Sequence, residues 1–151
     1  RDRSVSRGLG DVYKRQMTYE EMKSKACVAS SRSKPKNEEH KIQCSCVRYF
    51  RLKYPHLRNM LFAVPNAARR SARNGAYMKD EGMLPGVADL ILLKSNRFYG
   101  ALCVEMKKPG EYQRPVQKDW QKECEANGNK YVVVRSLDEF IKVVDNYLKE
   151  I

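Results

Sequence analysis

The sequence has only two histidines, and neither they nor its five cysteines are spaced as zinc ligands. No C-x-x-C pair occurs, the only two histidines are His40 and His56, and the cysteines are Cys27, Cys44, Cys46, Cys103 and Cys124. Protein zinc sites are built from such pairs and from closely spaced histidines. We therefore predict five reduced thiols, and we expect neither a zinc site nor the disulfide framework of a small secreted protein.

Long hydrophobic runs are also missing. No stretch approaches the roughly 18 apolar residues that a membrane-crossing helix needs. No basic and then apolar leader segment opens the chain. The sequence therefore predicts a soluble protein of the cytoplasm.

Acidic residues are scarce relative to basic ones. The 151 residues include 30 Lys and Arg against 18 Asp and Glu, a net charge of +12. Such an excess favours an anionic partner such as nucleic acid, and the alternative is a soluble protein that is merely basic. The length predicts one domain with a single core.

The first 36 residues lack the apolar periodicity of a folded core. Residues 1–16 resemble translated sequencing-adapter sequence, and Met17 is a plausible true start. Their five basic and two acidic residues contribute +3, so the chain from Met17 keeps +12 less +3, or +9. Residues 17–36 have only a weak helical pattern and predict a basic mobile arm, which leaves 37–151 as the folded domain.

Apolar periodicity and capping residues predict eight elements in this domain. A helix begins after Asn37 and ends before Pro55, and the last helix begins at Ser136, whose pairing with Glu139 forms a capping box. In chain order we expect helix 37–53, strand 60–64, a loop and short helix over 66–82, strands 90–93 and 101–106, helix 114–126, strand 131–134 and the helix from 136. The fold class is therefore α/β, with a small mixed sheet flanked by helices in the order α-β-α-β-β-α-β-α.

Two acidic residues and a lysine coincide on the predicted hairpin of strands 90–93 and 101–106. A turn centred near Arg97 pairs residues whose numbers sum to 194, which places Asp89 opposite Glu105, with about 5 Å between their Cβ atoms. Lys107 lies on the same face as Glu105 because side chains alternate along a strand.

Two carboxylates this close repel each other unless a cation lies between them. Mg²⁺ suits Asp89 and Glu105 because it prefers oxygen ligands and binds one or two carboxylates with several waters. The alternative is a solvated pair in which Glu105 forms an ion pair with Lys107 or Lys108.

The helix over 114–126 has an apolar stripe of Val116, Trp120 and Cys124, which we expect to face the core. Gln117, on a second stripe, could reach the carboxylates or a DNA phosphate, although an exposed glutamine commonly has no role. A basic segment before Asp89 contains Arg69, Arg70, Arg73 and Lys79. These side chains could bind phosphates, and the alternative is a solvated helix face.

From Glu38 to Ile151 the chain resembles the VRR-NUC domain of the PD-(D/E)xK nuclease superfamily, especially the stand-alone forms of bacteriophages and prophages. The matching pieces are FAVPN at 62–66, EGMLPGVAD at 81–89, VEMK at 104–107, Gln117 in the next helix, and VVVRS at 132–136. Their order and spacing both agree with the family. One departure is Ala88, which stands where the family has proline and removes turn stiffness rather than a ligand.

The resemblance implies a restriction-endonuclease-like core and roles for several residues. Asp89, Glu105 and the Met106 carbonyl would bind Mg²⁺ or Mn²⁺, and Lys107 would orient or activate the attacking water. Glu39 would complete the metal site, with Glu38 as the alternative. Gln117 would support the site. The residues expected to contact nucleic acid are Arg69, Arg70, Arg73, Lys79, Lys108 and Arg135, of which Arg135 matches the arginine in the family name and has an alternative structural role.

The implied activity is metal-dependent endonucleolytic hydrolysis of DNA, in a bacterial or phage-infected cell. Related stand-alone domains resemble Holliday-junction resolvases, which favours branched DNA as substrate and a homodimer as the assembly. A monomer that cuts flaps or duplexes is the alternative. A non-catalytic architectural DNA-binding protein and an RNA-processing enzyme are the other two hypotheses, and the acid-lysine pattern favours the nuclease over the former.

Overall fold

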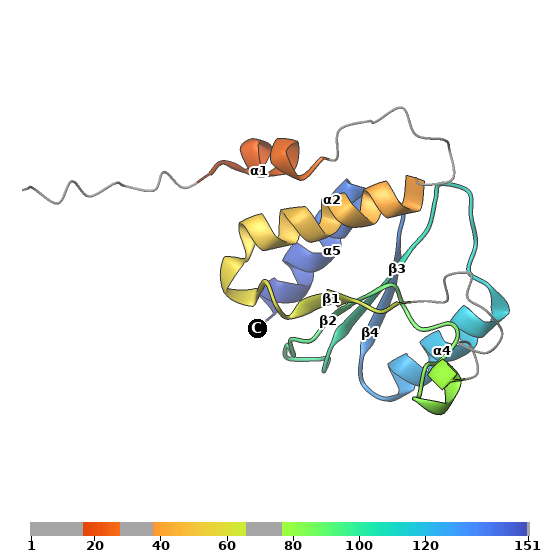
Figure 1. The fold of residues 1–151 in the computed structure, drawn as a ribbon. Helices are drawn as coiled ribbons and strands as arrows, with labels where there is room; N and C mark the ends of the chain where they lie inside the picture. The colour runs from red at the N-terminus through yellow and green to blue at the C-terminus, as the bar shows by residue number, and fades with distance from the viewer. Residues whose placement is uncertain (1–16, 28–37, 66–76, 151) are drawn as a thin grey trace, which may run out of the picture.

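A mixed four-stranded sheet with helices on both faces forms the centre of the protein (Figure 1). The computed structural model describes residues 17–27, 38–65 and 77–150. The strands are β1 (Leu61–Ala63), β2 (Leu90–Leu92), β3 (Leu102–Met106) and β4 (Lys130–Val134), and they lie in the order β1-β2-β3-β4. The pairs β1–β2 and β2–β3 are antiparallel, whereas β3 and β4 are parallel. The predicted fold class is confirmed, and the two strands expected to bear the site are the central ones.

Helices α2 (Glu38–Lys53) and α5 (Leu137–Lys149) pack together and share one core with the sheet. Phe50 from α2 and Phe140 from α5 are fully buried in this core with Leu102 and Val104 of β3. Helix α4 (Pro115–Ala126) connects β3 to β4 and covers the other face, where Cys103, Cys124 and Tyr131 are buried together. Successive side chains of β3 point to opposite faces of the sheet, so this strand contributes residues to two separate cores.

The helix boundaries agree with the signals in the sequence. Helix α2 ends two residues before Pro55, which begins the short 3₁₀ helix η2 (Pro55–Leu57). Ser136 caps α5 by accepting a hydrogen bond from the Glu139 N–H at 3.2 Å. The Glu139 carboxylate accepts from the Arg135 N–H rather than from the Ser136 N–H, so only half of the predicted capping box forms.

Of the predicted arm over 17–36, the structure describes residues 17–27, which contain a helix. Residues Tyr19–Ala26 form helix α1, capped by Thr18 and packed against α2. Ala26 is fully buried against Tyr49, and the Lys23 ammonium lies 2.6 Å from an Asp138 carboxylate oxygen on α5. The helix lies where the sequence has a weak helical pattern, and contacts with distant residues hold it in place. The remainder of that arm and residues 1–16 lie outside the described residues.

None of the helices in the described parts of the chain has the length and apolar character that a bilayer crossing requires. A short helical turn over 77–80 precedes the loop that leads into β2. The predicted loop and short helix over 66–82 otherwise lie mainly outside the described residues.

Candidate active site

The β2–β3 register brings the predicted residues to one end of the sheet. Ile91 pairs with Cys103, as the predicted register requires, and Asp89 immediately precedes β2. The Asp89 Oδ2 atom accepts a hydrogen bond from the Met106 N–H at 2.8 Å. The Asp89 carboxylate therefore lies beside the carboxyl-terminal end of β3, and its charge raises the pKa of Glu105.

Glu105 is fully buried, which is unusual for a carboxylate. Its Oε1 atom accepts hydrogen bonds from the Lys107 ammonium, at 2.6 Å, and from the Gln117 amide. Its Oε2 atom accepts from the Tyr131 hydroxyl at 3.3 Å. Burial is the largest influence on this carboxyl and raises its pKa, while Lys107 and Tyr131 lower it and Asp89 raises it further. The group is thus held in place by three donors in a site that disfavours its charge.

Lys107 joins two oxygens at the end of β3. Its ammonium contacts Glu105 Oε1 and, at 3.2 Å, the Met106 carbonyl oxygen, and its side chain is only 11% exposed. The backbone N–H of Lys107 donates to the Val134 carbonyl, which extends the parallel pairing by one residue. The ion pair expected in the alternative interpretation exists, but it is buried rather than solvated. Burying two charges is costly, so such a pair is weak evidence for a stabilising role.

Gln117 is a site residue whose burial the sequence did not predict. It is 2% exposed, its Oε1 atom accepts from the Arg114 N–H at 2.8 Å, and its Nε2 atom donates to Glu105. Because each amide atom has its own partner, the orientation of the side chain is fixed. The apolar stripe on α4 is correct for Trp120 and Cys124 but wrong for Val116, which is 45% exposed. The helix is rotated so that Gln117 faces the sheet.

Tyr131 was not recognised as a site residue from the sequence. Val133 of β4 pairs with Glu105 of β3. Tyr131 lies two residues earlier on β4, so its side chain is on the same face of the sheet as Glu105. Burial raises the pKa of its hydroxyl, and the neighbouring Glu105 charge raises it further, so Tyr131 remains a donor. The available signal was its place in a strand beside an apolar run, where a buried hydroxyl requires a partner.

Glu39, in the first turn of α2, faces the same region. Its carboxyl shares a hydrogen bond with the Glu111 carboxyl and interacts electrostatically with Lys107 and Asp89. Burial raises the pKa of Glu39 most, and the hydrogen bond with Glu111 raises it further. Glu38 is exposed. The structure therefore brings Glu39 to the site, together with Glu111, which the sequence did not suggest.

Gly86 fixes the loop that presents Asp89. Its φ is +85°, and a Cβ atom at this position would lie 2.5 Å from the Val116 carbonyl oxygen. The loop therefore passes against the backbone of the first turn of α4, a position and conformation that only glycine fits. Ala88, where the resemblance expects proline, is fully buried against Cys103, Cys124 and Tyr131. The loop that presents Asp89 is therefore in direct contact with the helix that carries Gln117.

Two of the predicted nucleic-acid contacts, Lys108 and Arg135, lie beside Glu111. Lys79 is exposed, and the Lys108 ammonium lies 3.6 Å from a Glu111 carboxylate oxygen. The Arg135 guanidinium donates to the Glu111 carbonyl at 3.2 Å, so it fastens the turn that follows β3. Arg69, Arg70 and Arg73 lie outside the described residues.

The oxygens at this end of the sheet suit a hard cation. Glu105 Oε1 and the Met106 carbonyl already converge on the positive charge of Lys107, with the Asp89 carboxylate beside them. Within 17–27, 38–65 and 77–150, no three His, Cys, Asp or Glu side chains lie close enough together to hold a metal ion, so Glu39 does not join the other two acids in one cluster. Two carboxylates and a carbonyl, completed by water, match the preference of Mg²⁺.

The fold and this arrangement define a small α/β domain with a restriction-endonuclease-like core. A solved structure described as a "VRR_NUC domain protein" has the same fold, with a TM-score of 0.66 and 24% sequence identity. The similarity covers 75% of this chain and 89% of that chain. No family model and no curated protein matches the sequence. The fold that the resemblance implied is confirmed.

Proposed function

We propose that this protein is a metal-dependent endonuclease that hydrolyses phosphodiester bonds in DNA. One observation carries the proposal: the Glu105 carboxylate is buried beside Asp89 and held by Lys107, Gln117 and Tyr131. A fully buried carboxylate with a raised pKa lowers stability, and such costs are concentrated at functional sites. The shared fold with a VRR_NUC domain protein supports the same class of activity.

Asp89, Glu105 and the Met106 carbonyl are the groups that would hold Mg²⁺ or Mn²⁺. When bound, the ion lowers the pKa of a coordinated water and neutralises negative charge on the scissile phosphate. The Met106 N–H keeps the Asp89 carboxylate at the end of β3, and Gln117 and Tyr131 prevent rotation of Glu105. Each ligand is therefore positioned by a neighbour that does not react.

Lys107 has a different task from the carboxylates. Its side chain donates to the Glu105 carboxylate and to the Met106 carbonyl, so we assign to it electrostatic stabilisation of the phosphate and positioning of the water before any general-base role. Glu39 and Glu111 lie at the edge of the site and interact with Lys107 or with each other. We place Glu39 there as an acid that supports the site.

We further propose that the substrate is branched DNA and that the protein acts on it as a homodimer. Two copies of this site related by a twofold axis would suit a four-way junction, whose strands are themselves related by symmetry. The basic character of the chain favours nucleic acid in either case. An architectural protein would use the same charge, but it would have no use for acids buried beside a phosphate-binding surface.

Cleavage of labelled linear, flap and four-way DNA by the chain from Met17, with Mg²⁺ or Mn²⁺, tests the proposal. An Asp89→Asn variant serves as the control because it preserves shape and removes one ligand charge. We expect cleavage that requires metal and is lost in the variant, with the four-way junction as the preferred substrate. Binding without cleavage under every metal would instead support the architectural hypothesis, and a preference for flaps would exclude the resolvase assignment.

A further inference from the structure

A groove runs along α2 on the surface of the protein, outside the site described above. It has a volume of about 520 Å³ and is lined by one side of α2 from His40 to Leu52 and by Arg58, which follows η2. Its lining residues on α2 include His40, Gln43, Val47 and Arg51, which recur at intervals of three or four and so share one face of the helix. The groove is therefore an elongated feature that follows the helix axis.

The groove is strongly basic. Arg48, Arg51 and Arg58 are exposed in its walls, and none of its lining residues is acidic. The sequence itself explains this, because residues 40–79 contain nine Lys and Arg and no Asp or Glu.

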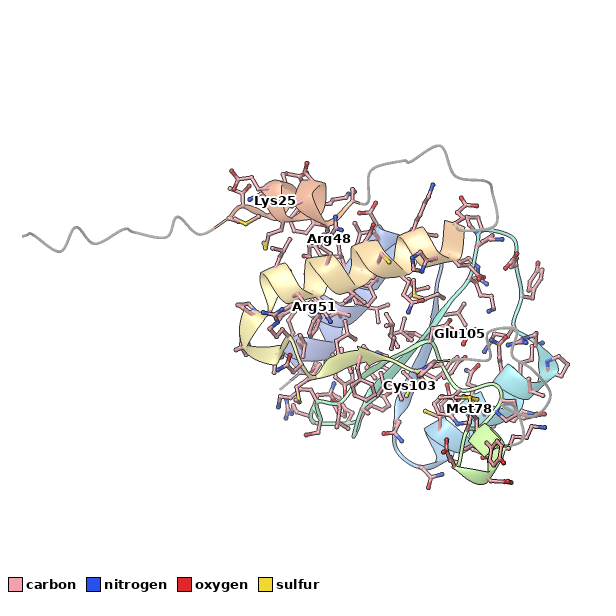
Figure 2. The ribbon with its side chains drawn as sticks, in the orientation of Figure 1. Lys25, Arg48, Arg51, Met78, Cys103 and Glu105 are labelled. Atoms are coloured by element: carbon pink, nitrogen blue, oxygen red, sulfur yellow. The ribbon has the colours of Figure 1, made fainter. Side chains whose placement is uncertain are left out.

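The arginine charges are available to a ligand. Within the described residues, Arg51 and Arg58 take part in no ion pair, and the Arg48 guanidinium donates only to the Lys25 carbonyl of α1, at 3.5 Å. A neutral carbonyl does not cancel a positive charge. Figure 2 shows Lys25 on α1 close to the stretch of α2 that carries Arg48 and Arg51.

The groove and the candidate active site share helix α2. Glu39, at the start of α2, interacts with Lys107 and Asp89, and the groove begins one residue later, at His40. At about 1.5 Å per residue, Arg51 lies about 18 Å from Glu39 along the helix axis. One strand of a DNA duplex presents a phosphate about every 3.4 Å along its axis, so this length spans about five phosphates.

We propose that the α2 groove binds the phosphate backbone of the DNA strand that extends from the active site. The choice of DNA as ligand rests on the proposed function. Arginine suits the task because its planar guanidinium can donate two parallel hydrogen bonds to a phosphate. Arg48, Arg51 and Arg58 bind successive phosphates of the strand. These contacts position the scissile bond near Lys107, and they carry no specificity for the base sequence of the DNA.

The test compares two triple variants that lose the same charge. The groove variant is Arg48→Gln, Arg51→Gln and Arg58→Gln, and the control is Lys118→Gln, Lys142→Gln and Lys149→Gln, three exposed lysines on α4 and α5. Binding of a labelled duplex is measured by fluorescence anisotropy in EDTA at several salt concentrations. We expect the slope of log K against log salt to fall by about 2.7 in the groove variant, at about 0.9 per phosphate contact, and to change little in the control.

Catalysis supplies an independent readout. In the presence of metal, we expect the groove variant to raise KM while kcat is retained, because the substituted residues hold the substrate and do not touch the reacting atoms. Equal loss of binding in both triple variants, or none in the groove variant, would overturn the inference, with thermal melting used to verify that each is folded. A protein that binds DNA through the groove but never cleaves it would contradict only the proposed function.

Discussion

The two faces of β3 differ sharply within five residues. On one face, Leu102, Val104 and Met106 are buried in an apolar core with α2 and α5. On the other face, Cys103 and Glu105 are buried against α4, and Glu105 requires three hydrogen-bond donors there. The comparison shows that burial alone does not identify a stabilising residue. One face stabilises the fold, whereas the other holds a charge at a cost to stability.

The largest expected effect is on the rate of cleavage, when Lys107 is removed from the polar face. We predict that Lys107→Ala lowers kcat by at least about 10²- to 10³-fold, the usual loss when a preorganised electrostatic contact is removed. Binding of DNA should persist, because the groove and the exposed basic residues are unchanged. Single-turnover cleavage and anisotropy measure the two quantities.

The matched control is Lys122→Ala, which removes a lysine exposed on α4 and ion-paired with Asp119. Its cleavage rate should equal that of the wild type. Unchanged cleavage by Lys107→Ala would remove this lysine from the mechanism.

Truncating a side chain on the apolar face should have an intermediate effect. It should lower the free energy of unfolding rather than the rate of cleavage. Leu102→Ala is predicted to lower the free energy of unfolding by about 2 to 5 kcal/mol, because it removes a fully buried side chain and leaves a cavity. Cys103→Ala, at the next position on the opposite face, removes one sulfur atom and should cost about 1 kcal/mol. Urea unfolding of the two variants measures the difference, and equal losses would contradict the assignment of stability to the α2 and α5 face.

The smallest expected effect is the pH dependence that Glu105 contributes to stability. Burial raises its pKa above the ordinary 4.5, so the folded protein holds this proton more tightly than the unfolded chain does. A raised pKa leaves stability intact below the unfolded value and lowers it as the pH rises through the folded value. Glu105→Gln removes this loss, which grows by at most about 1.4 kcal/mol for each pH unit between the unfolded and the folded pKa.

Urea unfolding in EDTA from about pH 4 to about pH 8 measures the effect. The difference between variant and wild type should move in favour of the variant as the pH rises and then level off. The ion pair with Lys107 exists only while Glu105 is ionised, so its effect is already part of the pKa of Glu105, and the slope of the difference reports the net effect of burial and its neighbours. A flat difference would show that the pKa of Glu105 is not raised on folding.

Much of the site followed from local rules. The alternation of a strand places Glu105 and Lys107 on one face, and the turn near Arg97 sets the register that pairs Ile91 with Cys103. These rules operate over a few residues, and so the sequence predicted the Asp89, Glu105 and Lys107 constellation and nearly every strand and helix. Identification of α2 and α5 was equally local, since their apolar stripes and flanking Pro55 and Ser136 lie in the helices or beside them.

Other features depended on how the elements pack. Whether Gln117 is exposed or buried depends on the rotation of α4, which Gly86 and the sheet decide, and Tyr131 becomes a partner of Glu105 only because β4 lies parallel to β3. Similarly, α1 is ordered by contacts with α2 and α5, and the acids Glu39 and Glu111 meet from segments about seventy residues apart.

The sequence by itself determined the strands, the helices other than α1 and the three residues of the acid-lysine pattern, because periodicity and register are properties of neighbouring residues. Only the tertiary structure decided which polar groups surround that pattern and where the basic groove lies relative to it. The physical reason is that hydrogen bonds and charge interactions depend on distances in space, which packing of remote elements sets.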